Sequence, residues 1–218
     1  QKIDISDIVA LSNAKRRQAF SDKLNDNLSP LALAAAVKMP KPAVIKNSKQ
    51  GLYFRETQEI KSDVEGNTLE HEYGHHVDFS ASNNMRYASQ QDKDFQQAFI
   101  DDAKKLGLAE GGTDFGAMLG FSISKEMSQN LRKLRDEFLV EVEKTKTYTR
   151  GRRKGMSFQY TAYEPRYLGA NSISDIIDAM SKGSFFTDFK CWGHGRHYYK
   201  RTGSVYYETF ATLFSIHG

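Results

Sequence analysis

The sequence has few cysteines, few prolines and no long apolar run. A single cysteine, Cys191, occurs among the 218 residues, so no disulfide can form within the chain and a cysteine-ligated zinc site is excluded. The longest purely apolar run covers residues 31–37, which is far too short to span a bilayer, so we expect no membrane partner. No signal peptide is visible. The chain begins with Gln1 instead of methionine, from which we expect a domain cut or processed out of a larger protein.

The chain has little net charge outside one segment. The net charge is 31 − 27 = +4, and six of the cations lie in residues 144–154, where there is no acid. The rest of the chain therefore sums to 4 − 6 = −2, which argues against a generally basic nucleic-acid-binding protein. These six cations are Lys144, Lys146, Arg150, Arg152, Arg153 and Lys154. We interpret the segment as a flexible, solvated connecting loop, and a nucleic-acid partner is not favoured.

The four prolines help to place the first elements. An apolar stripe predicts a helix over 5–20, and Ser29 followed by Pro30 predicts the start of a second helix that ends before Pro40 and Pro42. Two strands are then expected, "AVI" and "LYFRETQEI", joined by a turn-rich segment. A helix over about 67–79 should follow, so the pattern indicates an α+β protein.

Apolar residues at helical spacing predict two long helices in the middle of the chain. They comprise Phe95, Phe99, Ala103 and Leu106 in one helix, and Met127, Leu131, Leu134, Phe138 and Val142 in the other. Two shorter helices, "NSISDIIDAM" and "VYYETFATLFSI", are expected near the end. The length suits a single domain over 1–218, with a helical insertion over about 85–150.

The segment "LEHEYGHHVDF" contains the pattern H-E-x-x-H. His71 and His75 lie about 40° apart on one helix face, so both imidazoles can reach one metal ion, most commonly Zn²⁺. Glu72 lies about 100° round from His71, beside the metal, where it can act as a base towards an activated water. Gly74 costs about 1 kcal/mol inside a helix, which suggests that another segment packs close to this backbone.

A catalytic zinc site needs a third protein ligand. His76 points about 140° away from His71 and is a poor candidate, whereas Asp78 could ligate directly or orient a ligating imidazole. The extended form with a third histidine would need histidine at position 81, which is Ala81. Glu208 in "YYETFATLF" fits better, because an unpaired carboxylate would be costly to bury in so apolar a segment.

Taken together, "HEYGHHVD" and the later "ETFATLF" resemble gluzincin-type zinc metalloproteases, including the anthrax toxin lethal factor catalytic domain and the zincin domains of phage minor head proteins. The resemblance extends to "SISDIIDAM" and "WGHGRHYY" in the phage proteins. It implies a zincin-like fold with a small mixed sheet, an HExxH helix and a C-terminal glutamate helix. It also implies His71, His75 and Glu208 as zinc ligands and Glu72 as the general base.

The lethal-factor relatives also use a tyrosine shortly before the glutamate helix to stabilise the oxyanion. Tyr199 is the best match for it, and Tyr198 and Tyr206 remain alternatives. His194 and His197 are further candidates for contact with substrate or transition state.

The resemblance implies a zinc endopeptidase acting on a polypeptide substrate, within a phage head or ejected protein. Phage structural proteins are further expected partners, and the expected location is the virion or the host cytoplasm. Two alternatives stay open. One is a structural phage head component that zinc only stabilises, and the other is a host-directed toxin protease.

Overall fold

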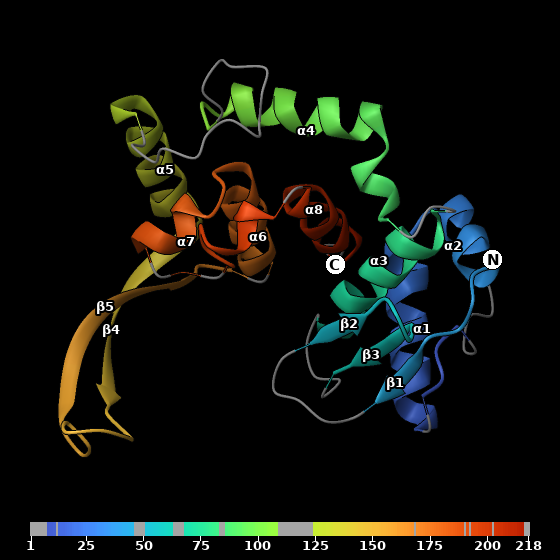
Figure 1. The fold of residues 1–218 in the computed structure, drawn as a ribbon, viewed down its shortest axis with the longest axis horizontal. Coiled ribbons are helices and arrows are strands. Elements are labelled where there is room, and N and C mark those ends of the chain that lie inside the picture. The colour runs from blue at the N-terminus through green and yellow to red at the C-terminus, as the bar shows by residue number, and fades with distance from the viewer. Residues whose placement is uncertain are drawn as a thin grey trace. The chain divides into compact units, whose positions relative to one another are not determined.

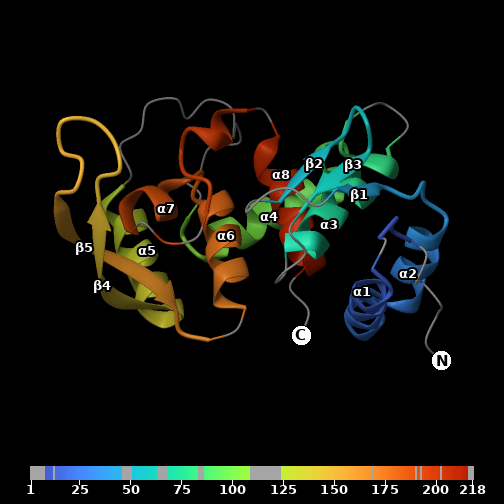
Figure 2. The same ribbon diagram turned by 90° about the horizontal axis from the view of Figure 1, so that it is seen from below.

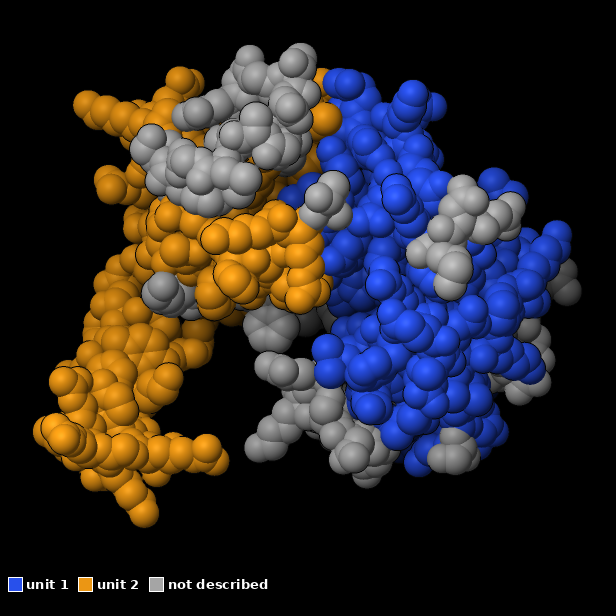
Figure 3. Space-filling model, in the orientation of Figure 1, with its two compact units in different colours: residues 1–98, 203–218 blue, residues 99–202 orange. Residues whose placement is uncertain are grey.

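The structure is a computed structural model with two compact units (Figures 1 and 3). Unit 1 comprises residues 1–98 and 203–218, and unit 2 comprises residues 99–202. The sequence predicted one domain with an insertion over about 85–150, and unit 2 begins and ends later than that insertion. The described residues are 8–11, 13–45, 51–62, 68–82, 86–108, 124–167, 169–189, 191, 193–201 and 203–215.

Unit 1 contains the helices α1 (Ala14–Asn27), α2 (Pro30–Val37), α3 (Thr68–Ser80) and α8 (Ser204–Ser215), with the short 3-10 helix η1 (Ala88–Gln90). The predicted second helix is confirmed. The Ser29 side chain accepts a hydrogen bond from the Ala32 N–H, and Pro30 occupies the first turn. The predicted motif helix is also confirmed as α3, and the predicted final helix as α8.

The first predicted helix, over 5–20, is wrong at both ends, since α1 covers Ala14–Asn27. Helix α1 starts at Ala14, where the Asn13 side chain accepts a hydrogen bond from the Arg16 N–H. Ahead of it, Ala10 forms a parallel bridge with Ala43 of β1 (Ala43–Ile45). The apolar residues around Ala10 are buried as expected, but they are not helical, and β-branched residues such as Ile8 and Val9 favour a helix less than other apolar residues do.

Unit 1 has a three-stranded mixed sheet in the order β1-β3-β2. Strand β1 pairs in parallel with β3 (Glu59–Lys61), which pairs antiparallel with β2 (Leu52–Phe54). The single strand predicted over 52–60 is therefore a hairpin, with a turn over 55–58 in which Gln58 has a φ of 52°. Strand β2 lies at one edge of the sheet, whereas the outer side of β1 carries the bridge to Ala10.

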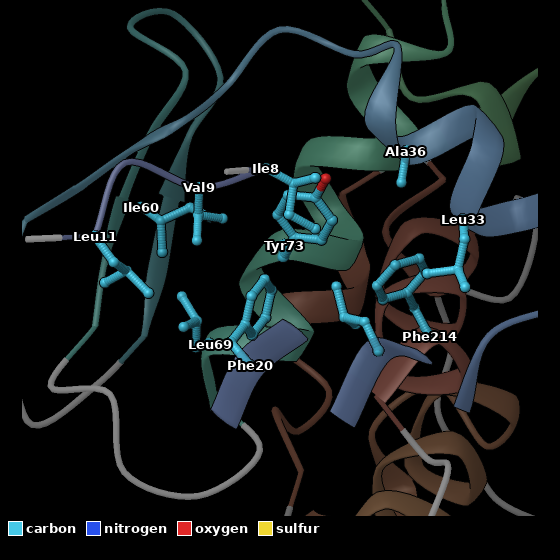
Figure 4. Packing of buried hydrophobic residues seen from close by; sticks show 11 residues of the cluster. Ile8, Val9, Leu11, Phe20, Leu33, Ala36, Ile60, Leu69, Tyr73 and Phe214 are labelled. Atoms are coloured by element: carbon cyan, nitrogen blue, oxygen red, sulfur yellow. The ribbon is translucent and has the colours of Figure 1, made fainter. Parts of the chain in front are cut away.

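The core of unit 1 forms where α1, α2, the sheet, α3 and α8 meet (Figure 4). Tyr73 of α3 is 1% exposed, and its ring meets Phe20 of α1 edge-on at 5.4 Å and Phe214 of α8 at 5.8 Å. Ile60, on the central strand, is fully buried. One face of α3 is thus fixed by apolar contacts, which leaves another face for polar residues.

Unit 2 contains two strands and the helices α5 (Lys125–Phe138), α6 (Ala170–Met180), α7 (Ser184–Phe189) and the 3-10 helix η2 (Tyr198–Lys200). Helix α4 (Lys93–Lys105) begins in the residue range of unit 1 and ends in that of unit 2. Strands β4 (Leu139–Thr147) and β5 (Ser157–Pro165) pair antiparallel. The helix predicted to reach Val142 ends at Phe138, so that part of the prediction was wrong. Beyond it the sequence "VEVEKTKT" alternates with period two and favours a strand.

Asp178 of α6 organises the glycine-bearing loop near the end of unit 2. Its carboxylate accepts hydrogen bonds from the N–H groups of Phe186, His194 and Gly195. A Cβ on Gly193 would lie 2.6 Å from Asp178 Oδ2, and Gly193 has a φ of 153°. The segments "SISDIIDAM" and "GHGRH" therefore form one structural feature. Burial raises the pKa of Asp178 to about 6, although these hydrogen bonds oppose the shift.

Within the ranges that the structure describes, every helix is too short or too polar to cross a membrane.

Candidate metal centre

Helices α3 and α8 bring together the three side chains that the sequence assigned to the metal. His71 Nε2 lies 3.4 Å from Glu208 Oε2, and His75 Nε2 lies 3.6 Å from the same oxygen. One ligand atom of each residue lies within 4.8 Å of the others, so this group could hold a metal ion. The imidazole rings of His71 and His75 are 4.8 Å apart and nearly perpendicular.

These separations suit two ligands of one ion better than a hydrogen bond. Zinc bonds of about 2.1 Å in a tetrahedron place neighbouring ligand atoms about 3.4 Å apart. A hydrogen bond from imidazole to carboxylate would bring the two atoms to about 2.7–2.9 Å. The observed 3.4 and 3.6 Å are close to the separation between two ligands of one ion. The donor set also fits, since neutral imidazole and carboxylate are common zinc ligands.

The close contact of α3 with α8 depends on Gly74. A Cβ at Gly74 would lie 2.8 Å from Ala211 Cα and 3.0 Å from Phe214 Cβ. Real Cβ atoms essentially never come as close as 2.8 Å to a backbone atom, so a side chain at this position would force the two helices to shift. The close packing that the sequence predicted at Gly74 is confirmed. Since Gly74 lies between His71 and His75, the approach also brings Glu208 to the histidines.

Glu72 is 7% exposed and lies against the beginning of the edge strand. A Cβ at Gly51, directly before β2, would lie 2.6 Å from Glu72 Oε1 and 2.9 Å from Glu72 Cγ. This contact could not be predicted from the sequence, because Gly51 ends a polar segment and looks like an ordinary turn residue. The close approach places the edge strand beside the proposed base.

The second nitrogens of the two histidines have different surroundings. His71 Nδ1 lies 3.4 Å from the Thr212 hydroxyl, which sits one helical turn after Glu208. His75 Nδ1 is buried and makes no hydrogen bond within the described part of the chain. The spacing of four between Glu208 and Thr212 could have indicated a shared face.

Asp78 takes neither of the two roles considered for it. Its carboxylate accepts hydrogen bonds from the Ser89 N–H at 2.7 Å and the Ser89 hydroxyl at 2.5 Å. The residue therefore anchors η1 to α3, and no hydrogen bond joins Asp78 to an imidazole within the described parts of the chain. Burial raises the pKa of Asp78 to about 6, while the hydrogen bonds from Ser89 act in the opposite direction.

His76 lies on the opposite side of α3 from the proposed ligands, as its spacing predicted. Its Nε2 is 2.7 Å from the Pro40 carbonyl, and its Nδ1 is 3.2 Å from the Tyr53 hydroxyl. Burial lowers the pKa of His76, so the ring is held neutral with Nε2–H donating to Pro40. Its role is therefore structural, linking α3 to the sheet and to the segment before it.

Two aromatic residues beside the ligands were missed by the sequence analysis. The rings of Tyr87 and Tyr207 stack at 4.5 Å, and they lie 5.9 and 5.7 Å from the His75 ring. Burial and the nearby charge of Glu208 contribute to a raised pKa of Tyr87. Tyr207 directly precedes Glu208, whereas the candidate named from the sequence was its neighbour Tyr206.

Tyr199 and His194 belong to unit 2, whereas the proposed ligands belong to unit 1. Tyr199 is 8% exposed on η2, and its ring meets the His194 ring edge-on at 6.1 Å. His194 stacks on Tyr198 at 4.3 Å, and its Nε2 lies 3.8 Å from Asp175. The roles opposite the metal therefore stay predictions for Tyr199, His194, Tyr198 and His197.

No family model, curated protein or solved structure matches this chain. The interpretation of the centre therefore depends on its own residues and geometry.

Proposed function

We propose that the protein is a zinc-dependent endopeptidase of the gluzincin type. One observation carries this proposal: the ligand atoms of His71, His75 and Glu208 are separated as an ion requires, and Glu72 lies beside them on the same helix. Three protein ligands leave one coordination position open, which is typical of a catalytic zinc site and not of a closed structural one.

Zinc at this site would polarise the scissile carbonyl and lower the pKa of a water molecule. Glu72 then accepts a proton from that water as its oxygen attacks the carbonyl carbon. When the C–N bond breaks, Glu72 gives the proton to the leaving amine, so the carboxylate is regenerated. Its low exposure of 7% strengthens the electrostatic contacts that this transfer needs.

The edge strand β2 offers a binding position for an extended polypeptide. Strand β3 occupies one side of β2, and its other side is the edge of the sheet within the described residues. An extended segment can add there through backbone hydrogen bonds, which are independent of side-chain identity. Gly51 brings the beginning of this strand against Glu72, so a bound peptide would run past the proposed base.

The test compares Glu72→Gln with Glu70→Gln in the full chain. Glu70 lies on the same helix and is also buried, but it pairs with Lys23 at 3.2 Å, away from the ligand group. Both variants should bind one zinc per chain by atomic emission. Glu72→Gln should hydrolyse an unfolded protein such as casein about 10²–10⁴-fold more slowly, whereas Glu70→Gln should retain activity.

Removal of zinc with a chelator should abolish hydrolysis, and added zinc should restore it. Equal cleavage by Glu72→Gln would contradict the proposed base. A wild-type chain that binds zinc but cleaves neither casein nor a peptide library would favour the structural alternative.

A further inference from the structure

The segment interpreted as a flexible connector, residues 144–154, forms the end of β4 and the turn of a long β-hairpin in unit 2 (Figures 1 and 2). Strands β4 and β5 pair over nine positions, from Leu139↔Pro165 to Thr147↔Ser157. Backbone hydrogen bonds between Tyr148 and Met156, and from the Gly155 N–H to the Tyr148 carbonyl, extend the pairing into the turn. We refer to residues 139–165 as the ribbon.

Charge is segregated along the ribbon. Its three acids, Glu141, Glu143 and Glu164, lie at the end formed by the beginning of β4, and residues 144–163 contain no acid. Lys144 pairs with Glu164 at 2.8 Å. No ion pair is present, within the described residues, for the other five cations, which are exposed: Lys146, Arg150, Arg152, Arg153 and Lys154. The turn end of the ribbon is therefore suited to an anionic partner.

The two faces of the ribbon differ in chemistry. Side chains alternate between the faces of a strand, so the directly paired residues Lys144↔Tyr160 and Lys146↔Phe158 share one face. The opposite face carries the pairs Glu143↔Thr161, Thr145↔Gln159 and Thr147↔Ser157. One face thus combines lysines with aromatic rings, whereas the other is polar and lacks cations over this stretch.

The aromatic rings on the lysine-bearing face form a row towards the turn. The Phe158 ring lies 5.2 Å from the Tyr148 ring and 5.9 Å from the Tyr160 ring. Arg153 lies over the Tyr148 ring at 5.8 Å. Phe158 is 39% exposed and Met156 is 60% exposed, although both are apolar. The packing of unit 2 itself does not explain why the exposed Phe158 lies between two partly exposed tyrosine rings, next to cations.

We propose that this face of the ribbon binds single-stranded nucleic acid. Lys146 on this face and the exposed cations of the turn would contact the phosphates. The rings of Phe158 and Tyr160 would stack on bases. Successive lysine–aromatic pairs repeat about every 6.8 Å, since they are two residues apart on a strand. This is about twice the 3.4 Å step of one strand in duplex DNA, so the spacing suits an extended strand with separated bases. An acidic polypeptide would neutralise the cations but would not use the rings.

The test measures binding of a fluorescently labelled oligothymidylate of about 20 nucleotides to the full chain by anisotropy, at several salt concentrations. Replacing four cations by serine (Arg150→Ser, Arg152→Ser, Arg153→Ser and Lys154→Ser together) should weaken binding at least about 10-fold at low salt. It should also reduce the slope of log K against log salt by up to about 3, since each phosphate contact on a single strand contributes about 0.7.

The rings are tested separately. Phe158→Leu and Tyr160→Leu keep an apolar side chain on the strand, and each should weaken binding about 5- to 150-fold with little change of the salt slope. The matched control is Thr145→Val on the opposite face, which should bind like the wild type. Circular dichroism of each variant distinguishes lost contacts from a lost ribbon.

Three outcomes would overturn the proposal. They are equal affinity for a duplex of the same length, equal affinity for polyglutamate at the same salt, and binding by the two leucine variants at the wild-type level. The proposal does not depend on proteolytic activity. Glu72→Gln, which lacks the proposed base, should therefore bind the oligonucleotide like the wild type.

Discussion

The α3–α8 contact of unit 1 and the ribbon of unit 2 differ in how far their polar residues are exposed to water. In the first, Glu208 is 2% exposed and His75 is 6% exposed, so their polar atoms are removed from water and need partners. In the second, the cations of the turn are exposed and keep their hydration. A substitution in the first region should therefore change metal binding or folding, whereas one in the second should change only recognition of a partner.

The largest effect is expected for Glu208→Ala. It removes one of three proposed ligands, so zinc affinity should fall by more than about 100-fold in a competition titration with a chromogenic chelator. The variant should remain folded without metal. The substitution removes a buried carboxylate, and such a group destabilises the fold when its ion is absent. Glu208→Gln is the matched control for shape, and it should lose nearly as much affinity because the charge is gone. Unchanged zinc affinity in both variants would remove Glu208 from the site.

The next effect tests whether unit 2 contributes to the chemistry of unit 1. If the Tyr199 hydroxyl stabilises the oxyanion, Tyr199→Phe should lower kcat by about 100-fold while KM changes little, because the contact forms mainly in the transition state. Tyr198→Phe, on the same 3-10 helix, tests the alternative residue, and the role belongs to the tyrosine whose loss lowers kcat. If neither variant lowers kcat, Tyr87 or Tyr207, whose rings contact His75, becomes the better candidate.

Much of the site could be predicted because its spacing is local. A separation of four residues puts His71 and His75 on one helix face in any fold, and Glu208 was recognisable from its apolar setting. The contacts of Gly51 and Tyr87 could not be predicted, since they depend on segments that meet only in the folded chain.

The errors in the predicted fold have a different physical cause. A separation of four residues, as between Phe138 and Val142, fits a helix turn and also fits two steps of strand alternation. Intervening Val140 and the following threonines favour the strand, because β-branched side chains suit extended backbone. The same ambiguity affected the residues before Ala14. The single strand expected over 52–60 missed its turn, since neither glycine nor proline marks that turn in the sequence.

A smaller effect is expected for Gly74→Ala, which tests the helix contact without touching a ligand. Alanine favours a helix by about 1 kcal/mol, but its Cβ would lie 2.8 Å from the backbone of Ala211, which has little freedom to move. Overpacking of this kind costs about 1–3 kcal/mol, so we expect a net loss of up to about 2 kcal/mol in urea unfolding, together with weaker zinc binding. A stabilised variant with normal zinc affinity would show that the two helices need no such approach.

The smallest effect is expected for the ribbon, where Arg150→Ser, Arg152→Ser and Arg153→Ser together should leave zinc content and casein hydrolysis unchanged. The three side chains are exposed, and among the described residues Arg153 makes a 3.4 Å hydrogen bond and a ring contact, both with Tyr148. Exposed contacts of this kind contribute about 0–1 kcal/mol each, so the melting temperature should fall by no more than a few degrees. Differential scanning calorimetry of the triple variant, with Thr145→Val as control, measures the change. A loss of zinc or a large fall in melting temperature would show that the ribbon is part of the folding core. The contrast between the two regions would then fail. Exposure would no longer separate the residues that recognise a partner from the residues that stabilise the fold.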